Sequence, residues 1–274
     1  MEPFVLQQEE FFTIKDWHQI PGLVAGFTTK LGGSSQGVFS SLNMGLHVHD
    51  SSEAVLKNRR QIAKQLGFPV EHWAGAEQTH EIHIENVTKQ QRGKGALKYE
   101  ESYKGTDGFF TQEKGIMLTM CYADCIPLYF FHPQSKSIGV VHAGWKGSVN
   151  GIAMKMVDKF KAVHVPLNEI QVVIGPGICE QCYVVDDRVI THVDKLLEDV
   201  DEKPYNLRED GQYHLNLKEL NRQILIHAGL NEDNLKMTNY CTSCHHEYFF
   251  SHRRDAGKTG RMMSFIGWKE DSLS

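Results

Sequence analysis

The sequence predicts an α+β fold, with a mixed or antiparallel sheet and flanking helices in a single domain over residues 1–274. Short runs of β-forming residues outnumber amphipathic helical patterns, and many of these runs are separated by only a few turn residues. The chain also contains no internal repeat and no linker long enough to separate two domains. Hairpin-like connections between strands favour α+β over alternating α/β architecture.

Composition excludes several classes of function. Hydrophobic residues make up 41% of the chain, charged residues 23%, and the net charge is −5, which is typical of a soluble globular protein. Mild acidity gives no electrostatic basis for binding nucleic acid. No run reaches the ~18 apolar residues that cross a bilayer, and Met1–Glu10 lacks a basic signal-peptide region. We therefore expect a cytoplasmic protein without membrane partners; composition does not specify an oligomeric state.

The first part of the chain predicts two strands and a helix. Phe4–Ile14 and Leu23–Thr28 are rich in β-formers, and the second leads into residues 28–35, either an anion-binding loop or an ordinary turn. Ser52 is expected to cap a helix from Glu53 to Leu66 that Gly67 ends. Its apolar stripe comprises Val55, Ile62 and Leu66, whereas Arg59 and Arg60 are expected on the solvated face.

Residues 76–85 alternate with period two, which predicts a strand. His80, Ile82 and Ile84 would share the inward face, and His83 would point to solvent. An inward histidine is either a hydrogen-bonded core residue or a ligand. After a polar loop at 90–105, the chain re-enters order at 106–111, where Asp107 is positioned to cap or orient backbone.

The second half predicts further helices and strands. We expect helices over Ser148–Val163, with Ile152, Met156 and Phe160 inward, and over Asp187–Leu197. Asn216 with Glu219 resembles a capping box that opens a helix to Ala228, ended by Gly229. The remaining expectations are a strand at Ile170–Ile174, a charged, mobile segment at 198–211, and a tail hairpin within Tyr240–Trp268 whose returning strand is Arg261–Trp268.

The segment Met117–Gly147 holds the most informative pattern. Ile116–Met120, Ile126–Phe131 and Ser137–Val141 read as strands. If residues 132–135 form a tight turn, positions that sum to 267 face each other, and Cys125 lies opposite His142. Directly opposed side chains have Cβ atoms ~5 Å apart, close enough to share a metal ion or to form a thiolate–imidazole pair.

Three arrangements of cysteine and histidine compete. The first is a Cys₄ zinc site from Cys179/Cys182 and Cys241/Cys244, but 58 residues separate the pairs, against the usual ~15–20, and unpaired buried thiols are favoured. The second is a catalytic zinc site of Cys125, His142 and a third ligand, best supplied by His80, with an open fourth position. The third uses Cys125 as a nucleophile and His142 as its base. A buried pair without function is the alternative to both.

Residues 143–147 follow His142 as a strand-to-helix turn. Its backbone N–H groups and Lys146 favour an anion such as phosphate, and Trp145 either stacks on a planar base or packs in the core. Asp124 is a candidate general acid or base. In a regular strand it would point away from Cys125, unless Pro127 interrupts the strand.

Several separate motifs resemble the YfiH/YlmD family, once described as polyphenol oxidases or multicopper laccases and now regarded as purine nucleoside phosphorylases. In chain order they are LGGSSQGVFSSLNMG (31–45), EQTH (77–80), TDGFFT (106–111), YADCIPL (122–128), VVHAGWKG (140–147), IGPGICEQCYVV (174–185) and FFSHRRDAGKTGRMMSF (249–265). The resemblance covers nearly the whole chain and implies a fold related to cysteine hydrolases of the cytotoxic-necrotizing-factor type.

The resemblance also implies a site and an activity. It places one zinc ion per chain on His80, Cys125 and His142, and implies phosphorolysis of adenosine, inosine and S-methyl-5′-thioadenosine, with adenosine deamination as a second reaction. Catalysis is expected from Cys125 and Asp124. Purine nucleoside and phosphate are expected at Lys146, Gly144, Gly147, Asn43 and Tyr183.

Some features depart from the family pattern and leave alternatives. Lys146 stands where arginine is usual, which keeps the charge but loses bidentate phosphate recognition. The region of Cys179 and Cys182 varies in the family, and Cys244 lies outside its pattern. Copper is disfavoured, since His47-Val48-His49 is the sole His-x-His pair. A metal-independent cysteine hydrolase and a zinc-stabilised purine-binding module remain the alternative functions.

Overall fold

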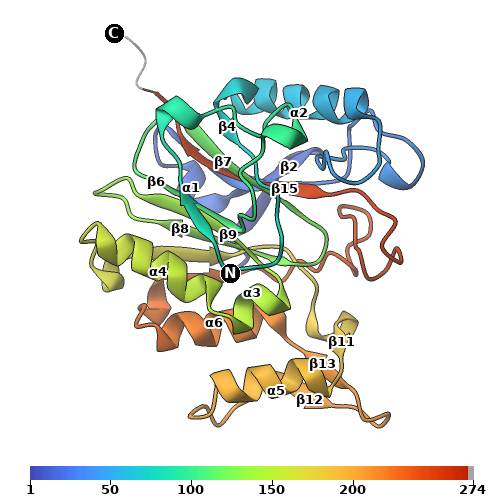
Figure 1. The fold of residues 1–274 in the computed structure, drawn as a ribbon, viewed down its shortest axis with the longest axis vertical. Coiled ribbons are helices and arrows are strands. Elements are labelled where there is room, and N and C mark those ends of the chain that lie inside the picture. Colours follow the sequence, from blue (N-terminus) through green and yellow to red (C-terminus); the bar gives the residue numbers. More distant parts are fainter. Residues whose placement is uncertain (271–274) are drawn as a thin grey trace.

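Two six-stranded sheets form the centre of the molecule, with helices on both outer sides (Figure 1). The computed structural model describes residues 1–270. An apolar cluster between the sheets joins Phe27 and Leu118 of the first sheet to Tyr129 and Phe131 of the second, all nearly inaccessible to solvent. The predicted α+β class with mixed sheets and flanking helices is therefore confirmed.

Both large sheets are mostly antiparallel, with parallel pairs at their edges. The first has the order β1 (Phe4–Gln8), β2 (Phe11–Ile14), β3 (Leu23–Thr28), β15 (Met262–Trp268), β7 (Ile116–Tyr122) and β4 (Trp73–Ala74). The second has the order β14 (Leu235–Met237), β10 (Gln171–Ile174), β8 (Ile126–Phe131), β9 (Ile138–Ala143), β6 (Gly108–Thr111) and β5 (Ile84–Asn86). The pairs β4–β7, β10–β14 and β5–β6 are parallel.

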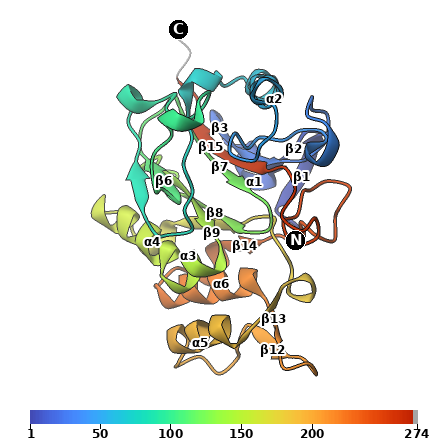
Figure 2. The same ribbon diagram turned by 45° about the vertical axis from the view of Figure 1, so that its right-hand side comes forward.

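Six α-helices accompany the two sheets in the described part of the chain, and three of them cover the outer faces. The six are α1 (Lys15–His18), α2 (Ser52–Leu66), α3 (Trp145–Val149), α4 (Ile152–Ala162), α5 (Asp187–Leu196) and α6 (Leu217–His227). In Figure 2, α2 lies beyond the first sheet, whereas α4 and α6 lie on the opposite side of the molecule, below the second. No helix within residues 1–270 is long and apolar enough to cross a membrane.

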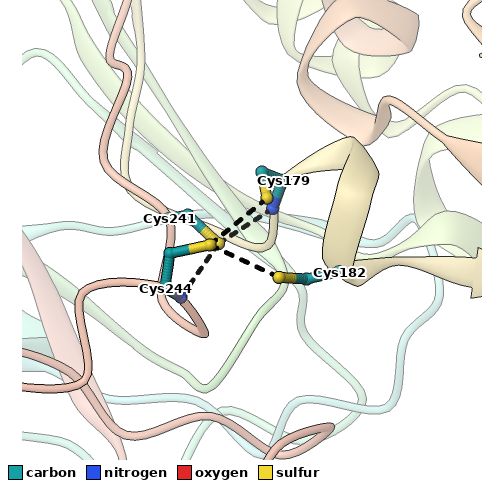
Figure 3. Close-up of side chains that lie close together, drawn as sticks. All are labelled: Cys179, Cys182, Cys241 and Cys244. Carbon is teal, nitrogen blue, oxygen red and sulfur yellow. Dashed lines mark hydrogen bonds between the residues drawn. The ribbon is translucent and has the colours of Figure 1, made fainter.

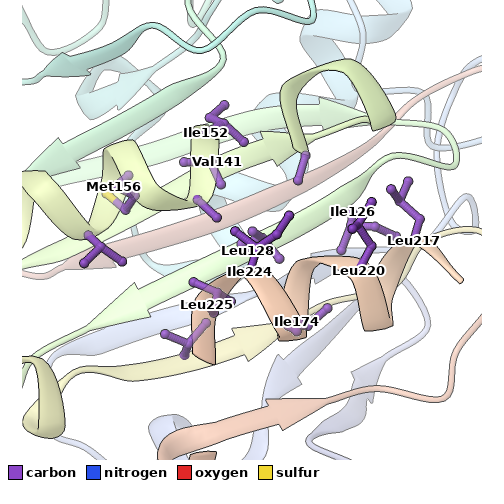
Figure 4. Close-up of a cluster of buried hydrophobic side chains, with 14 of the residues drawn as sticks. Ile126, Leu128, Val141, Ile152, Met156, Ile174, Leu217, Leu220, Ile224 and Leu225 are labelled. Atoms are coloured by element: carbon purple, nitrogen blue, oxygen red, sulfur yellow. The ribbon is translucent and has the colours of Figure 1, made fainter. Parts of the chain in front are cut away.

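The second apolar cluster fixes α4 and α6 against the second sheet. Figure 4 shows Leu128 of β8 and Val141 of β9 facing Met156 of α4 and Ile224 of α6. A small sheet of β11 (Val184–Val185), β13 (Tyr213–Leu215) and β12 (Tyr205–Leu207) lies with α5 at the far end (Figure 1). The predicted charged segment 198–211 thus contains a strand.

Local capping signals predicted two helices well. Asn216 caps α6, accepting a hydrogen bond from the Glu219 N–H at 3.0 Å, and Gly229 follows with φ +93°. Gly67 ends α2 in the left-handed conformation. The cap of α2 is Ser51 rather than Ser52, because its hydroxyl accepts from the Ala54 N–H.

Other expectations were wrong where tertiary contacts or glycine intervene. Phe4–Ile14 is a hairpin of two strands rather than one strand. The helix expected over Ser148–Val163 is divided at Gly151, whose φ is +88°, although Ile152, Met156 and Phe160 are buried as predicted. In the tail, residues 240–251 form turns, while the returning strand is confirmed as β15.

Arg59 is buried, contrary to expectation. Its guanidinium donates to the carbonyl oxygens of Met44, Gly95 and Ala96, so its donors are satisfied without water. Arg60, the next residue, is exposed as predicted.

The β8–β9 register differs from the expected one by two residues. Pro127, not Cys125, lies opposite His142, because the turn extends over residues 132–137. A shift of two residues keeps the same face of a strand, whereas a shift of one would reverse it. Cys125 therefore lies diagonally across from His142 and still approaches it.

Candidate metal centre and substrate pocket

Cys125 lies where the chain crosses from one sheet to the other. β7 ends at Tyr122 and β8 begins at Ile126, so Ala123, Asp124 and Cys125 form the connection. Asp124 has φ +89°, a conformation that interrupts strand alternation. Both Asp124 and Cys125 consequently line one pocket, which a regular strand would not allow.

His142 lies near the end of β9 and is oriented by a buried carboxylate. Its Nδ1 is 2.8 Å from Asp107 Oδ1, and Asp107 is fully buried. This bond leaves Nε2 of His142 free to act as a ligand or a base.

His80 reaches the site from a loop, not from the predicted inward strand face. Only Ile84–Asn86 of that segment is a strand, and His80 itself is exposed with φ +63°. Asp107 holds the loop: its carboxylate accepts from the N–H groups of Thr79, His80 and Glu81 at 2.8–3.1 Å. Asp107 was expected to orient the backbone of its own segment, 106–111; it orients the backbone of residues 79–81 instead.

Together these elements bring three ligand types into one place. The ligand atoms of His80, Cys125 and His142 all lie within 4.8 Å of one another. Gly144 keeps the space open, because a Cβ there would lie 3.0 Å from Cys125 Sγ and 3.2 Å from His80 Cδ2. One thiolate and two imidazoles around an open position fit a catalytic zinc ion.

Charge coupling activates Cys125. Burial raises the pKa of the thiol, but the charge of His142 and hydrogen bonds from His142 and His80 outweigh burial and lower it to about 6. Burial conversely lowers the pKa of His142, while Cys125 and Asp107 raise it to about 9. Without a metal ion, these two groups therefore form a thiolate–imidazolium pair at neutral pH.

Asp107 stays ionised beside them. Burial raises the pKa of its carboxyl group. The hydrogen bond to His142, the charge of His142 and the N–H donors of Glu81 and Thr79 outweigh burial, so the pKa lies below its ordinary value.

The cluster lies in a cavity of about 410 Å³, within the range of small-molecule sites. Gly144, Trp145 and Tyr183 line this cavity, as do five residues that sequence reasoning did not single out. Those five are His47, Gln78, His252, Arg253 and Arg261. The SHRRDAGKTGRM stretch, with its cluster of basic residues, is the signal that could have identified three of them.

Two arginines give the pocket cationic groups. The Arg253 guanidinium lies 5.1 Å from the centre of the Tyr183 ring, and its Nη1 donates to the Val184 carbonyl. The Arg261 side chain donates to the carbonyl oxygens of Thr259 and Gly260. Burial lowers the pKa of Arg261, which the charges of the nearby cysteines oppose.

Two neutral side chains, His47 and Tyr183, line the same pocket as the arginines. Burial, followed by the charges of Arg261 and Arg59, lowers the pKa of His47 to about 4, so His47 is neutral at physiological pH. Burial and the charge of Cys125 raise the pKa of Tyr183 well above its ordinary value, so its hydroxyl remains protonated.

Asp124 and Asn43 are held by internal hydrogen bonds. Asp124 Oδ1 accepts from the Thr242 hydroxyl at 2.6 Å, and Oδ2 accepts from the Arg253 N–H at 2.7 Å. Asn43 is buried outside the pocket lining, where its Oδ1 accepts from the Arg261 N–H at 2.8 Å. Each side chain thus positions an arginine of the pocket.

Lys146 and Gly147 do not line the pocket. Lys146 is exposed, with Nζ 5.9 Å from the centre of the Trp145 ring, and Gly147 is buried within α3. A direct phosphate contact by Lys146 stays a prediction from the sequence.

A second group of possible metal ligands lies outside this pocket lining. Cys179, Cys182, Cys241 and Cys244 come together, and of these only Cys241 is buried (Figure 3). The four thiols are unpaired, as expected, but the expectation that they are buried was wrong for three of them. The fold closes the 58-residue gap between the pairs and brings all four together. Within residues 1–270, these two clusters are the groups of three or more His, Cys, Asp or Glu residues close enough to hold a metal ion.

Comparison with known proteins gives a consistent result. Residues 24–269 match the family described as multi-copper polyphenol oxidoreductase laccase. The chain is 46% identical, over 98% of both chains, to "Purine nucleoside phosphorylase YlmD" of Bacillus subtilis, and 34% identical to "Purine nucleoside phosphorylase SSP1584" of Staphylococcus saprophyticus, over 91% of this chain and 93% of that one. The crystal structure of YlmD from Geobacillus stearothermophilus superposes with a TM-score of 0.95 at 43% identity, covering 98% of this chain and 100% of that one.

Proposed function

The chain belongs to the YfiH/YlmD family, and on that premise we propose that it is a zinc-dependent purine nucleoside phosphorylase formed by one catalytic domain. The observation that carries the proposal is the convergence of His80, Cys125 and His142 in a cavity that also presents two arginines. A metal centre beside a cationic surface suits a reaction between a neutral nucleoside and an anionic nucleophile.

The donor set fits zinc. His80, Cys125 and His142 would hold the ion, and Asp107 orients His142 and the His80 backbone toward it. Zinc in such a site supplies Lewis-acid stabilisation of negative charge developing on the substrate. The donor set does not favour multinuclear copper, because the three ligand atoms within 4.8 Å of one another describe a single-ion site.

We place phosphate on the arginine side of the pocket. Arg253 and Arg261 offer guanidinium donors that match phosphate oxygens, and Asp124 and Asn43 fix the backbone of each. A phosphate oxygen held there forms a bond to the anomeric carbon as the bond from that carbon to the purine nitrogen breaks. Holding both reactants in this geometry supplies much of the rate enhancement.

The purine is placed between the metal ligands and the aromatic lining. Trp145 is half-buried in the pocket and offers a face for stacking. The protonated hydroxyl of Tyr183 is a donor for the purine as negative charge develops on it. The proposed substrates are adenosine, inosine and S-methyl-5′-thioadenosine, and adenosine deamination is proposed as a second reaction.

Product analysis tests this proposal. Purified protein is expected to convert adenosine to adenine and ribose 1-phosphate only when phosphate is supplied, and to inosine at a rate independent of phosphate. Chelator-treated protein is expected to lose both reactions and to regain them with zinc. Full adenosine turnover by metal-free protein would contradict the zinc requirement.

A cysteine hydrolase is the second candidate, favoured by one observation. Cys125, His142 and Asp107 form a nucleophile–base–carboxylate series, in which the pKa of Cys125 is about 6. This alternative predicts that metal-free protein hydrolyses an amide or ester substrate and that alkylation of Cys125 abolishes hydrolysis. Loss of all activity on zinc removal, with recovery on zinc addition, argues against it.

A further inference from the structure

Four cysteines from two distant segments meet outside the catalytic cluster. Cys179 and Cys182 belong to a turn after β10, and Cys241 and Cys244 belong to the tail after β14. Their ligand atoms all lie within 4.8 Å of one another. Figure 3 shows the four side chains close together. We propose that these four thiolates hold one structural zinc ion, separate from the ion proposed at Cys125.

The distances between the sulfur atoms match tetrahedral zinc. With Zn–S bonds of about 2.3 Å, the sulfurs of a ZnS₄ tetrahedron lie about 3.8 Å apart. Cys244 Sγ is 3.7 Å from Cys179 Sγ and 3.4 Å from Cys182 Sγ. Disulfide bonding requires about 2.05 Å, and all four residues are free thiols in this structure.

The backbone builds this arrangement independently of the sulfurs. Gly177 and Cys241 form a parallel β-bridge, and the Thr242 N–H donates to the Gly177 carbonyl at 3.2 Å. The two Cys-x-x-Cys turns are therefore placed side by side by main-chain contacts, so their approach does not depend on flexible side chains.

Hydrogen-bond donors and a buried cation surround the sulfurs. Cys241 Sγ accepts from the backbone N–H groups of Cys179 at 3.2 Å and Cys244 at 3.4 Å. The buried Lys218 ammonium donates to the Thr238 and Tyr240 carbonyls, and its charge interacts favourably with the cysteines of the cluster. Four thiolates around Zn²⁺ leave a charge of −2, which this lysine partly compensates.

The donor set favours zinc over other occupants. Tetrahedral sites of four soft sulfur ligands hold zinc or the iron of iron–sulfur centres. Two Cys-x-x-Cys pairs that close around one point, with no open position, are typical of structural zinc.

Such an ion would fix one side of the substrate pocket. Ile178 and Tyr183, which line the pocket, flank the Cys179–Cys182 turn directly. Between Cys241 and Cys244, Thr242 donates to the Asp124 carboxylate. Zinc would thus join the two segments that position Tyr183 and Asp124, without touching substrate.

Metal counting on the full chain tests the proposal. We expect two zinc ions per chain by elemental analysis, one in Cys244→Ser and one in Cys125→Ala. Cys121→Ser is the matched control, since this cysteine belongs to neither cluster, and it should keep both ions. If only the catalytic assignment is wrong, the wild type contains one zinc, kept in Cys125→Ala and lost in Cys244→Ser.

A second measurement, made on the wild type, tests the proposal even if Cys244→Ser fails to fold. In native wild-type protein, N-ethylmaleimide is expected to leave Cys179, Cys182, Cys241 and Cys244 unmodified until a chelator removes zinc, after which all four react together. Unchanged zinc content in folded Cys244→Ser, iron in place of zinc, or alkylation of the four cysteines while zinc remains bound would each overturn the proposal.

Discussion

Asp107 and His142 are joined by a 2.8 Å hydrogen bond inside the protein, and the same carboxylate holds the loop that carries His80. One side chain therefore orients two of the three residues proposed to bind the catalytic zinc. Asp107 lies 27 positions after His80 and 35 before His142.

Asp107→Asn is expected to weaken zinc binding at His80, Cys125 and His142 by about 10–100-fold, with a parallel loss of phosphorolysis. An amide has one acceptor oxygen, which cannot satisfy both His142 and the three backbone donors. Chelator competition measures the affinity. Glu85→Gln, a loss of charge at a half-buried carboxylate outside the cluster, is the control. Wild-type affinity in Asp107→Asn would show that the carboxylate is dispensable.

Gly144→Ala is expected to impair the same centre by crowding it. The backbone of Gly144, with φ −73° and ψ 168°, is accessible to alanine, so the effect must come from the added methyl group. That group meets Cys125 Sγ at 3.0 Å and His80 Cδ2 at 3.2 Å, an overpacking that costs about 1–3 kcal/mol. Because the clash is present without an ion, the melting temperature of the metal-free protein should fall by several degrees, and zinc affinity should fall as well. Wild-type zinc affinity in Gly144→Ala would show that the ligands accommodate the methyl group.

Arg261→Ala should raise the KM for phosphate about tenfold or more, since a hydrogen bond to a charged group contributes roughly 1.5–3 kcal/mol. Arg261→Lys should recover only part of this loss, because lysine lacks bidentate geometry. Lys146→Ala, at an exposed position outside the pocket, is the matched control and should leave the KM near the wild-type value. Initial rates at varied phosphate concentration measure the KM of each variant. A larger increase in KM for Lys146→Ala than for Arg261→Ala would indicate that phosphate binds at the α3 turn.

Alkylation of Cys125 in zinc-free protein should have a midpoint near pH 6. Thiolate is the reactive form, so a pKa lowered to about 6 makes Cys125 react at a pH where an ordinary thiol, with a pKa of about 8.5, is protonated. His142→Ala should move the midpoint upward, because it removes the main charge that lowers the pKa. Peptide mass spectrometry separates Cys125 from the other five cysteines. A midpoint near 8.5 in the wild type would contradict the proposed coupling.

Signals confined to a few residues predicted structure well in this chain. Gly67 and Asn216 mark real helix ends, as expected. The β8–β9 register was wrong by two residues, but an even shift preserves the face, so Cys125 and His142 still meet.

Contacts between distant segments explain what the sequence alone did not predict. His80 reaches the centre because the carboxylate of Asp107, just before β6, holds its loop, not because of strand alternation. Arg253 lies beside Tyr183 because of the path of the tail, which no periodic pattern reveals. The four-cysteine cluster likewise depends on a bridge between Gly177 and Cys241.

β15 has a consequence for how the chain matures on the ribosome. This strand follows every other element in the described chain, yet it lies between β3 and β7 in the interior of the first sheet. Until residues 262–268 leave the ribosome, β3 and β7 each present an unpaired edge, the kind of surface that promotes aggregation of nascent chains. The arginine at position 261 immediately precedes this strand. The pocket is therefore completed only after residue 261 has been translated.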